Sequence, residues 1–457
     1  MTTGLSLRAG VPGAVAAGVE EFGGRPVVLV RSDPTAAPGA PCGPGAPGAL
    51  TASDGATIAV AARLALESRL PLVVVFSTSG ASVSEGMDAL HGWGEAARAL
   101  SACSGVVPVC MAVSGPALAG PSLLLGLVDV VVMSPDALAF VCGPGMVSAF
   151  TGMGVTMAEL GGAAVHANQT GVAALLAADA DDALAAVAEV LSYLPAHCDE
   201  EAPLFRTGDP PRRPTPELRD VLPASERGSY DVRRVTTALA DDGECCELRA
   251  AWAPQLVTAL ARIDGRPVGI VANQPQSLAG TLDIAASQKG ARFVAWCDAF
   301  NLPIVTLVDT SGFLPGKDLE WRGMIRHGAE LVFAYARATV PRICVILRKA
   351  YGGAYIVMDS RGMGSDLCVA WPSAEVAVMG AAPAVQILYR REDAPSQARR
   401  VDDYRHDHLT PWKVAERGLV DAVIDPAETR AVLSAGLATL ATKRERLVSR
   451  RHDNSPL

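Results

Sequence analysis

Short apolar runs, almost free of polar residues, recur along the chain and are separated by stretches with a helical period. Runs such as 70–76 and 343–347 have the length of strands that are buried on both faces of a sheet. Between such runs, segments such as 58–67 and 284–300 carry small and apolar residues at helical spacing. Buried strands that alternate with helices predict parallel β–α units, so the expected fold class is α/β.

Four of these segments occur twice, in the same order. "GRPVVLV" at 24–30 returns as "GRPVGIV" at 265–271, and "LPLVVVFSTSG" at 70–80 returns as "LPIVTLVDTSG" at 302–312. Likewise "VVPVCMAVSGPALAG" at 106–120 matches "TVPRICVILRKAYGG" at 339–353, and 128–144 matches 365–381. Two unrelated α/β domains with generic patterning are the alternative, but four matches in one order favour an internal duplication.

The duplication sets the expected domain boundaries. We expect an N-terminal domain over residues 1–204, a connector over 205–244 that includes "GDPPRRPTPELRD", and a C-terminal domain over 245–457. The segment 33–55 is rich in Pro, Gly and Ala, which predicts an irregular or mobile loop.

Composition narrows the function classes. Half of the 457 residues are hydrophobic, and the net charge of -9 gives no basic footprint for nucleic acid or an anionic membrane. The apolar runs are too short to span a bilayer, and no secretory signal precedes them, so we expect a cytoplasmic protein. Ten scattered cysteines form no CxxC pair and no zinc spacing, which predicts reduced core residues and no bound metal.

The glycines that end the apolar runs are the candidate chemistry. Gly352 and Gly353 stand between the run 343–347 and a helical pattern, where backbone N–H groups at a helix start can approach a ligand closely. Such donors suit a developing oxyanion, for example a thioester enolate. A tight turn without a ligand is the alternative. Recurrence of the pattern at the equivalent place of the duplicated unit favours a function.

Other catalytic motifs fit less well. "GFLPGKD" at 312–318 lacks the spacing and the Ser or Thr of a P-loop, and no GxSxG, HExxH or GxGxxG stands in a suitable context. His327 is a possible catalytic residue, but a histidine on a helix surface or in a cap is the more frequent case. The sequence therefore offers backbone donors where most enzymes offer side chains.

Five segments together resemble a known family. "GRPVGIVANQP", "KGARFVAWCDAFNLPIVTLVDTSGFLPG", "IRHGAELVFAYARATVP", "RKAYGGAYIVMDS" and "AWPSAEVAVMGA" look like the carboxyltransferase (β) subunit of biotin-dependent acyl-CoA carboxylases, the propionyl-CoA and acetyl-CoA carboxylase group. The resemblance runs from about 245 to 391 and resumes at 410–430. It is weaker but in register in the N-terminal copy, at 159–173 and 191–195.

The resemblance implies a fold, a reaction and partners. It implies two tandem crotonase-like β-β-α superhelix domains of the ClpP/crotonase superfamily, usually in a homo-hexamer or a mixed hexamer with active sites between subunits. The family moves CO2 from carboxybiotin to the α-carbon of a short acyl-CoA, and the biotin nitrogen is thought to remove the proton. No Met-Lys-Met biotinylation site is present, so biotin would sit on a separate carrier protein and a biotin carboxylase subunit would be needed.

Site residues follow from the resemblance by position. Gly353 and Ala354 would form one oxyanion hole, facing the biotin ureido oxygen, and Ala119 and Gly120 the other, facing the thioester. Ile356 falls where family members select acyl length: propionyl-type enzymes carry an acid there, and an apolar residue goes with acetyl-CoA or broader use; simple packing is the alternative. Further substrate contacts are implied at Gly80, Ala81, Gly143, Pro144, Gly312, Phe313, Gly352 and Tyr355.

The N-terminal copy departs from the family pattern. The usual leader helices are largely missing, "SGGAR" becomes "TSGAS" with Ser82 in place of an arginine, and "CAGGA" becomes "LAGPS", where Pro121 has no N–H to donate. These changes lie in the half expected to bind CoA. We therefore keep two alternatives, a decarboxylase or transcarboxylase that uses the same site and a non-catalytic structural paralogue.

Overall fold

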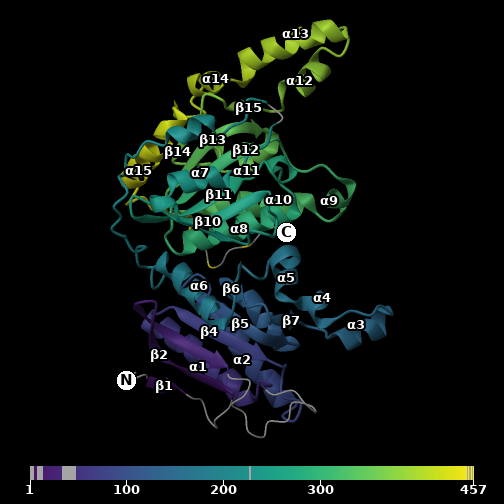
Figure 1. Cartoon of the computed structure of the whole chain (residues 1–457), viewed down its shortest axis with the longest axis vertical. Coiled ribbons are helices and arrows are strands. Elements are labelled where there is room, and N and C mark those ends of the chain that lie inside the picture. Colours follow the sequence, from purple (N-terminus) through teal and green to yellow (C-terminus); the bar gives the residue numbers. More distant parts are fainter. Residues whose placement is uncertain are drawn as a thin grey trace. The chain divides into compact units, whose positions relative to one another are not determined.

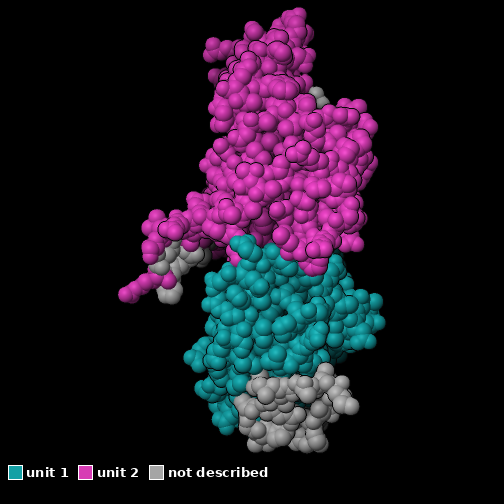
Figure 2. All heavy atoms as spheres, turned by 90° about the vertical axis from the view of Figure 1, so that its left-hand side faces the viewer, with its two compact units in different colours: residues 1–203, 249–252 teal, residues 204–248, 253–457 magenta. Residues whose placement is uncertain are grey.

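The chain folds into two compact units. The computed structural model describes residues 5–7, 14–32, 48–225 and 228–449, with residues 451, 454 and 456. Unit 1 comprises Met1–Pro203 and Arg249–Trp252, and unit 2 comprises Leu204–Leu248 and Ala253–Leu457 (Figure 2). Each unit is built on an eight-stranded sheet (Figure 1).

Unit 1 has the strand order β1-β2-β3-β4-β5-β6-β8, and β7 also pairs with β5. Its strands are β1 (Leu5–Leu7), β2 (Val15–Phe22), β3 (Arg25–Ser32), β4 (Leu72–Thr78), β5 (Val109–Leu118), β6 (Val130–Met133), β7 (Leu138–Phe140) and β8 (Leu175–Leu176). Its helices are α1 (Ala52–Ser68), α2 (Met87–Cys103), α3 (Pro144–Thr151), α4 (Met157–Gly161), α5 (Ala163–Val165) and α6 (Ala180–Ser192), with a 3₁₀ helix at Gly120–Leu127.

Unit 2 has the corresponding order β9-β10-β11-β12-β13-β14-β16, and β15 also pairs with β13. Its strands are β9 (Cys245–Leu248), β10 (Leu256–Ile263), β11 (Arg266–Asn273), β12 (Ile304–Thr310), β13 (Arg342–Tyr351), β14 (Leu367–Ala370), β15 (Glu375–Ala377) and β16 (Ala422–Val423). Its helices are α7 (Arg233–Leu239), α8 (Ile284–Ala299), α9 (Lys317–Trp321), α10 (Met324–Arg337), α11 (Gly352–Val357), α12 (Ala381–Leu388), α13 (Ala394–Tyr404), α14 (Pro411–Glu416) and α15 (Thr429–Thr439).

The two sheets repeat each other strand by strand. In each, the first three strands pair antiparallel and the later ones pair parallel. Each also shifts its register at the same place, between Phe76 and Thr78 in β4 and between Val308 and Thr310 in β12. The predicted α/β class and the tandem organisation are therefore confirmed.

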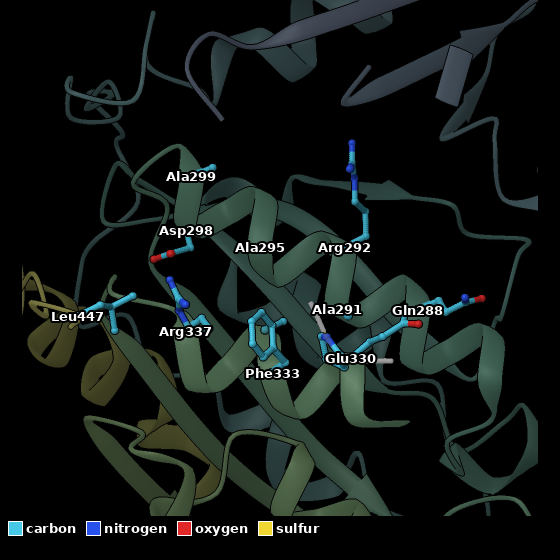
Figure 3. A pocket seen from close by; sticks show the side chains of 12 residues that line it. Gln288, Ala291, Arg292, Ala295, Asp298, Ala299, Glu330, Phe333, Arg337 and Leu447 are labelled. Carbon is cyan, nitrogen blue, oxygen red and sulfur yellow. The ribbon is translucent and has the colours of Figure 1, made fainter. Parts of the chain in front are cut away.

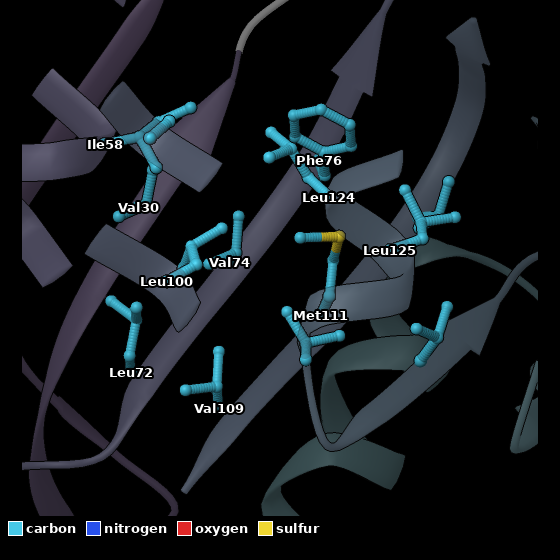
Figure 4. Close-up of a cluster of buried hydrophobic side chains, with 14 of the residues drawn as sticks. Val30, Ile58, Leu72, Val74, Phe76, Leu100, Val109, Met111, Leu124 and Leu125 are labelled. Atoms are coloured by element: carbon cyan, nitrogen blue, oxygen red, sulfur yellow. The ribbon is translucent and has the colours of Figure 1, made fainter. Parts of the chain in front are cut away.

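Both faces of each sheet are buried, as the uninterrupted apolar runs predicted. In unit 1, alternate residues of β4 and β5, such as Val74 and Met111, pack into one core with Ile58 of α1 and Leu100 of α2 (Figure 4). The residues between them, such as Val73, are also buried but belong to the other face. This burial supplies the hydrophobic stabilisation that holds the strand ends, and hence the turns that follow them, in place.

Two segments differ from the simplest expectation. Residues 33–47 of the predicted loop lie outside the described residues, while residues 52–55 form the first turn of α1, because Thr51 and Asp54 make reciprocal capping hydrogen bonds. Residues 205–244, predicted as a connector, supply side chains such as Leu218, Val232 and Leu239 to the core of unit 2.

No helix in the described ranges is both long and apolar enough to cross a membrane.

Candidate functional site

The predicted glycine pair of unit 2 lies at the junction of β13 and α11. Gly352 has φ +60, a conformation that glycine adopts without strain, and it turns the chain from the strand into the helix. Tyr351 precedes the helix without a side-chain cap, and no described residue accepts a hydrogen bond from the N–H of Gly353. Gly353 is exposed, so its amide is open to a ligand.

Ala354, the second predicted donor of this turn, is in a different position. It has no exposed surface within the chain, whereas Gly353 and Ile356 form the exposed side of α11. Residues three apart lie on one side of a helix, so Ile356, 45% exposed, stands beside Gly353. Tyr355 is buried, and burial raises the pKa of its hydroxyl well above the ordinary value, so its side chain faces the interior rather than a ligand.

Polar contacts at the end of β12 position this turn. The buried Asp309 carboxylate accepts from the Arg348 side chain at 3.0 Å and from the Lys349 amide at 3.1 Å, which joins β12 to β13 just before the turn. The Thr310 side chain bonds both backbone groups of Gly312. The next residue, Phe313, places its ring 3.6 Å from where a Cβ on Gly353 would lie. The predicted residues Gly312, Phe313, Gly352 and Gly353 are therefore neighbours.

A buried ion pair holds the other end of α11. Arg342 donates to Asp359 at 2.5 Å and to the carbonyl of Gly364 at 2.7 Å, and both side chains are almost wholly buried. Burial raises the pKa of Asp359 to about 7, although the neighbouring Arg342 lowers it. This pair was missed in the sequence, because a lone arginine and a lone aspartate seventeen positions apart form no pattern.

The equivalent turn of unit 1 is altered at its first position. Ala119 occupies the place of Gly352 and shares its φ of +60, with ψ −151, a region populated almost only by glycine. Its N–H donates to the Phe140 carbonyl at 2.9 Å, so Ala119, predicted as an oxyanion donor, already uses its amide within the sheet. Pro121 has no N–H, which leaves Gly120 as the turn residue whose amide has no acceptor among the described residues.

An aromatic ring also covers this turn. A Cβ on Gly120 would lie 3.2 Å from the Trp93 ring of α2, and the buried Trp93 Nε1 has no hydrogen-bond partner among the described residues. Trp93 takes the place that Phe313 has in unit 2, although it comes from a different element. Neither aromatic contact could be found from periodicity, because both are long-range contacts made across a turn.

The remaining predicted residues of unit 1 lie beside this turn or at the start of α3. A Cβ on Gly80 would lie 3.3 Å from that of Ala119, and Ala81 forms a bridge with Leu50 that repeats the bridge between Leu282 and Phe313. Gly143 and Pro144 begin α3 after β7. The structure therefore brings Gly80 and Ala81 to the turn at Ala119 and Gly120, whereas Gly143 packs beside Phe140, whose carbonyl accepts from the Ala119 amide.

Two of the cavities in unit 2 are large enough to bind a small ligand. One of about 440 Å³ lies over α8 and α10, where Phe333 and Ala295 form an apolar floor flanked by Arg337 (Figure 3). It includes none of the predicted site residues. The second, of about 380 Å³, adjoins the end of β13 and includes Tyr351. Within the described ranges, no group of three or more His, Cys, Asp or Glu side chains is placed to hold a metal ion.

Comparison with known proteins shows the family. The carboxyl transferase domain family matches residues 3–455. The chain belongs to the carboxyl transferase family. It is 43% identical over 422 residues to the propionyl-CoA carboxylase beta chain of Saccharopolyspora erythraea, covering 88% of this chain and 77% of that protein. It is 42% identical over 403 residues to the methylmalonyl-CoA decarboxylase subunit alpha of Veillonella parvula, covering 88% and 79%.

A solved structure extends the likeness to the fold. The transcarboxylase 12S crystal structure, described as a hexamer assembly with methylmalonyl-coenzyme A and methylmalonic acid bound, matches with a TM-score of 0.93 at 40% identity. The match covers 97% of this chain and 85% of that one. The predicted family, the enzyme class of carboxyltransferase and the crotonase-like fold are thereby confirmed. The roles of individual residues stay predictions.

Proposed function

We propose that this carboxyltransferase serves a biotin-dependent acyl-CoA carboxylase and transfers a carboxyl group to the α-carbon of a short acyl-CoA. The observation that carries the proposal is the open Gly353 amide at the start of α11, repeated at Gly120 in unit 1. Carboxyl transfer to a thioester passes through an enolate, and preorganised backbone donors stabilise that charge without a side-chain base. This chemistry agrees with turns that present backbone amides.

Each turn would hold one oxygen. The amide of Gly353, with Ala354 behind it, would bind the ureido oxygen of biotin, and Gly120 would bind the thioester oxygen of the acyl-CoA. Carboxybiotin supplies the activated CO2 when it is bound. The rings of Phe313 and Trp93 lie against Gly353 and Gly120, respectively, and give each turn an apolar side, next to which a hydrogen bond to developing charge is stronger than in water.

Biotin would arrive on a separate protein. The five lysines of the chain, Lys289, Lys317, Lys349, Lys413 and Lys443, lie outside any Met-Lys-Met sequence. The relatives named above include a beta chain and an alpha subunit, names that describe parts of larger enzymes. A biotin carboxylase with a biotin carrier is therefore the partner that we propose.

A second copy of the chain is the other proposed partner. The two units expose apolar side chains at equivalent places, with Phe150 of α3 92% exposed and Ile387 of α12 62% exposed. Val141 and Val378, which precede these helices, are also exposed. Exposed apolar side chains at equivalent places on α3 and α12 favour contact with another copy of the same chain. Phe150→Glu and Ile387→Glu should each reduce the molecular mass measured by light scattering, whereas the exposed Leu204→Glu should not.

A reconstituted assay tests the reaction. The purified chain, combined with a biotin carboxylase and a biotin carrier protein, should fix labelled bicarbonate into acetyl-, propionyl- or butyryl-CoA. The carrier alone is the control for background fixation. CO2 release from malonyl- or methylmalonyl-CoA without any fixation would replace the proposal with a decarboxylase. Failure to bind any acyl-CoA would replace it with a structural subunit.

A further inference from the structure

The cavity of about 380 Å³ beside β13 is not explained by the two oxyanion turns. Its walls come from residues 222–224, from the end of β13, and from residues 380–383 at the start of α12. Tyr351 is a lining residue, but Gly353 and Ala354 are not. The cavity is therefore a separate space that adjoins the proposed biotin-facing turn.

The cavity lining has more cationic than anionic side chains. Its lining contains three cations, Arg348, Lys349 and Arg405, and one anion, Glu375. Arg348 is paired with Asp309, which lies behind the wall, at 3.0 Å. Arg405 is paired with Glu375 at 2.9 Å. The lining thus holds more positive charge than its own carboxylate neutralises.

Lys349 is the cation of this lining for which the described residues form no ion pair. Lys349 and Glu375 stand opposite each other in the register of β13 and β15, yet the Glu375 carboxylate contacts Arg405 and the Tyr351 hydroxyl instead. In the part of the chain that the structure describes, the Lys349 ammonium makes no ion pair and no side-chain hydrogen bond. It is half-buried, and the nearby Asp309, with which it interacts electrostatically, is already paired with Arg348. A half-buried ammonium without an ion pair of its own favours an anionic ligand.

The shape of the cavity limits that ligand. Its volume of about 380 Å³ is about thirteen times the roughly 30 Å³ share of one water molecule, so a small organic anion fits as well as a simple ion. A Cβ on Gly380 would lie 3.3 Å from the Tyr351 ring, so this ring packs closely against the backbone of residue 380 and the two form one wall of the cavity. The volume and the positive charge of the lining suit a carboxylate or a phosphate group.

We propose that this cavity is an anion subsite in which Lys349 binds a carboxylate or a phosphate of the substrate. The inference deepens the proposed function, because it gives the acyl-CoA or its carboxylated product a charged anchor beside the Gly353 turn. The same oxyanion chemistry has two sources in such a substrate, the carboxylate of a carboxylated acyl group and the phosphates of its nucleotide end.

Binding of two isolated probes distinguishes these sources. Malonate represents the carboxylate, and adenosine 3′,5′-bisphosphate represents the phosphates. Both are titrated into the full chain at low salt by isothermal calorimetry. We expect one probe to bind saturably, and Lys349→Met to weaken it by about tenfold or more, the usual effect of losing one charge-assisted hydrogen bond. Lys349→Arg should retain most of the affinity.

Two further variants keep the test independent of folding. Ala382 is exposed at the start of α12 and lines the cavity, so Ala382→Asp adds a repelling charge without disturbing the core and should weaken the same probe severalfold. Lys413→Met removes an exposed lysine paired with Glu416 and should change nothing. The proposal is overturned if neither probe binds, or if a probe binds equally well to wild type, Lys349→Met and Ala382→Asp.

The binding test of the anion subsite and the activity test of the proposed function can fail independently. Carboxyl transfer with no probe binding would remove the anion subsite and leave the function standing. Probe binding that depends on Lys349, in a chain without transfer activity, would do the reverse.

Discussion

Replacing Gly353 with proline tests the proposed chemistry at a single atom. The substitution removes the amide hydrogen that we assign to the oxyanion and leaves the rest of the turn in place. Gly353→Ala is the matched control, because it adds a side chain but keeps the N–H. Comparing the two variants separates the donor from the space around it.

The structure sets the size of each effect. A Cβ at Gly353 would meet the Phe313 ring at 3.6 Å, an ordinary contact, so alanine fits. The Gly353 amide lies in the first turn of α11, so proline breaks no hydrogen bond of the helix. Proline and alanine both reduce the conformational freedom of the unfolded chain relative to glycine, which stabilises the folded state by about 0.4–1 kcal/mol. The net change in the free energy of unfolding should therefore be about 1 kcal/mol or less. Loss of one oxyanion donor costs about 2.7–4 kcal/mol, or about 10²–10³ in kcat.

The assay is carboxyl transfer in the reconstituted complex, with thermal unfolding measured on the same samples. We expect Gly353→Pro to lose about 10²–10³ in kcat with little change in Tm, and Gly353→Ala to stay within about threefold of wild type. Wild-type activity in both variants would refute the assignment of the donor. An equal loss of activity in both variants would show that crowding by the added atoms, not the hydrogen bond, controls the rate.

Three other substitutions test separate parts of the site. Ala119→Gly should raise the free energy of unfolding of unit 1 in urea by up to about 2 kcal/mol, because the strain of φ +60 exceeds the added chain entropy; destabilisation would contradict this. Ile356→Asp should lower kcat/KM for acetyl-CoA at least about tenfold relative to kcat/KM for propionyl-CoA if this position selects acyl length, because the resemblance implies an acid here in propionyl-type enzymes; Ile356→Val should have a small effect. Asp359 has a folded pKa of about 7, above its unfolded value, so the folded chain holds an extra proton between about pH 4 and pH 7 and loses stability as pH rises through that window. Asp359→Asn should flatten this slope in urea unfolding, and an unchanged slope would exclude Asp359 as its source.

Most of the fold could be predicted, because it depends on short apolar runs. Each of the duplicated segments contains one strand, or two strands in the case of 128–144 and 365–381, and 284–300 became α8 to within one residue. Strands buried on both faces leave a continuous hydrophobic signal in the sequence. The order of the repeats then fixed the order of the strands, since equivalent segments occupy equivalent places in the two sheets.

The donor geometry could be predicted only in part. The sequence locates the glycine turns, but it cannot show that the Ala119 amide is bound to Phe140 or that Ala354 has no exposed surface. Both facts arise from pairing with distant segments. The unpaired charge of Lys349 was missed for the same reason, because it depends on Glu375 making its contacts elsewhere.

The two turns are closer in function than their sequences suggest. The turn residues are Gly352, Gly353 and Ala354 in unit 2 and Ala119, Gly120 and Pro121 in unit 1. They differ at the first and third positions, and in the sequence this difference suggests that the N-terminal copy has lost donors. The first position of that copy donates within the sheet, and the third position of the other copy, Ala354, has no exposed surface. What remains open in each unit is the amide of the middle glycine, Gly353 or Gly120, with an aromatic ring against it. The substitutions in unit 1 therefore leave its central donor intact, and the loss of an N–H at Pro121 falls at a position where the equivalent amide is enclosed. Retention of this one donor in both units is the physical reason to expect an active carboxyltransferase rather than a structural subunit.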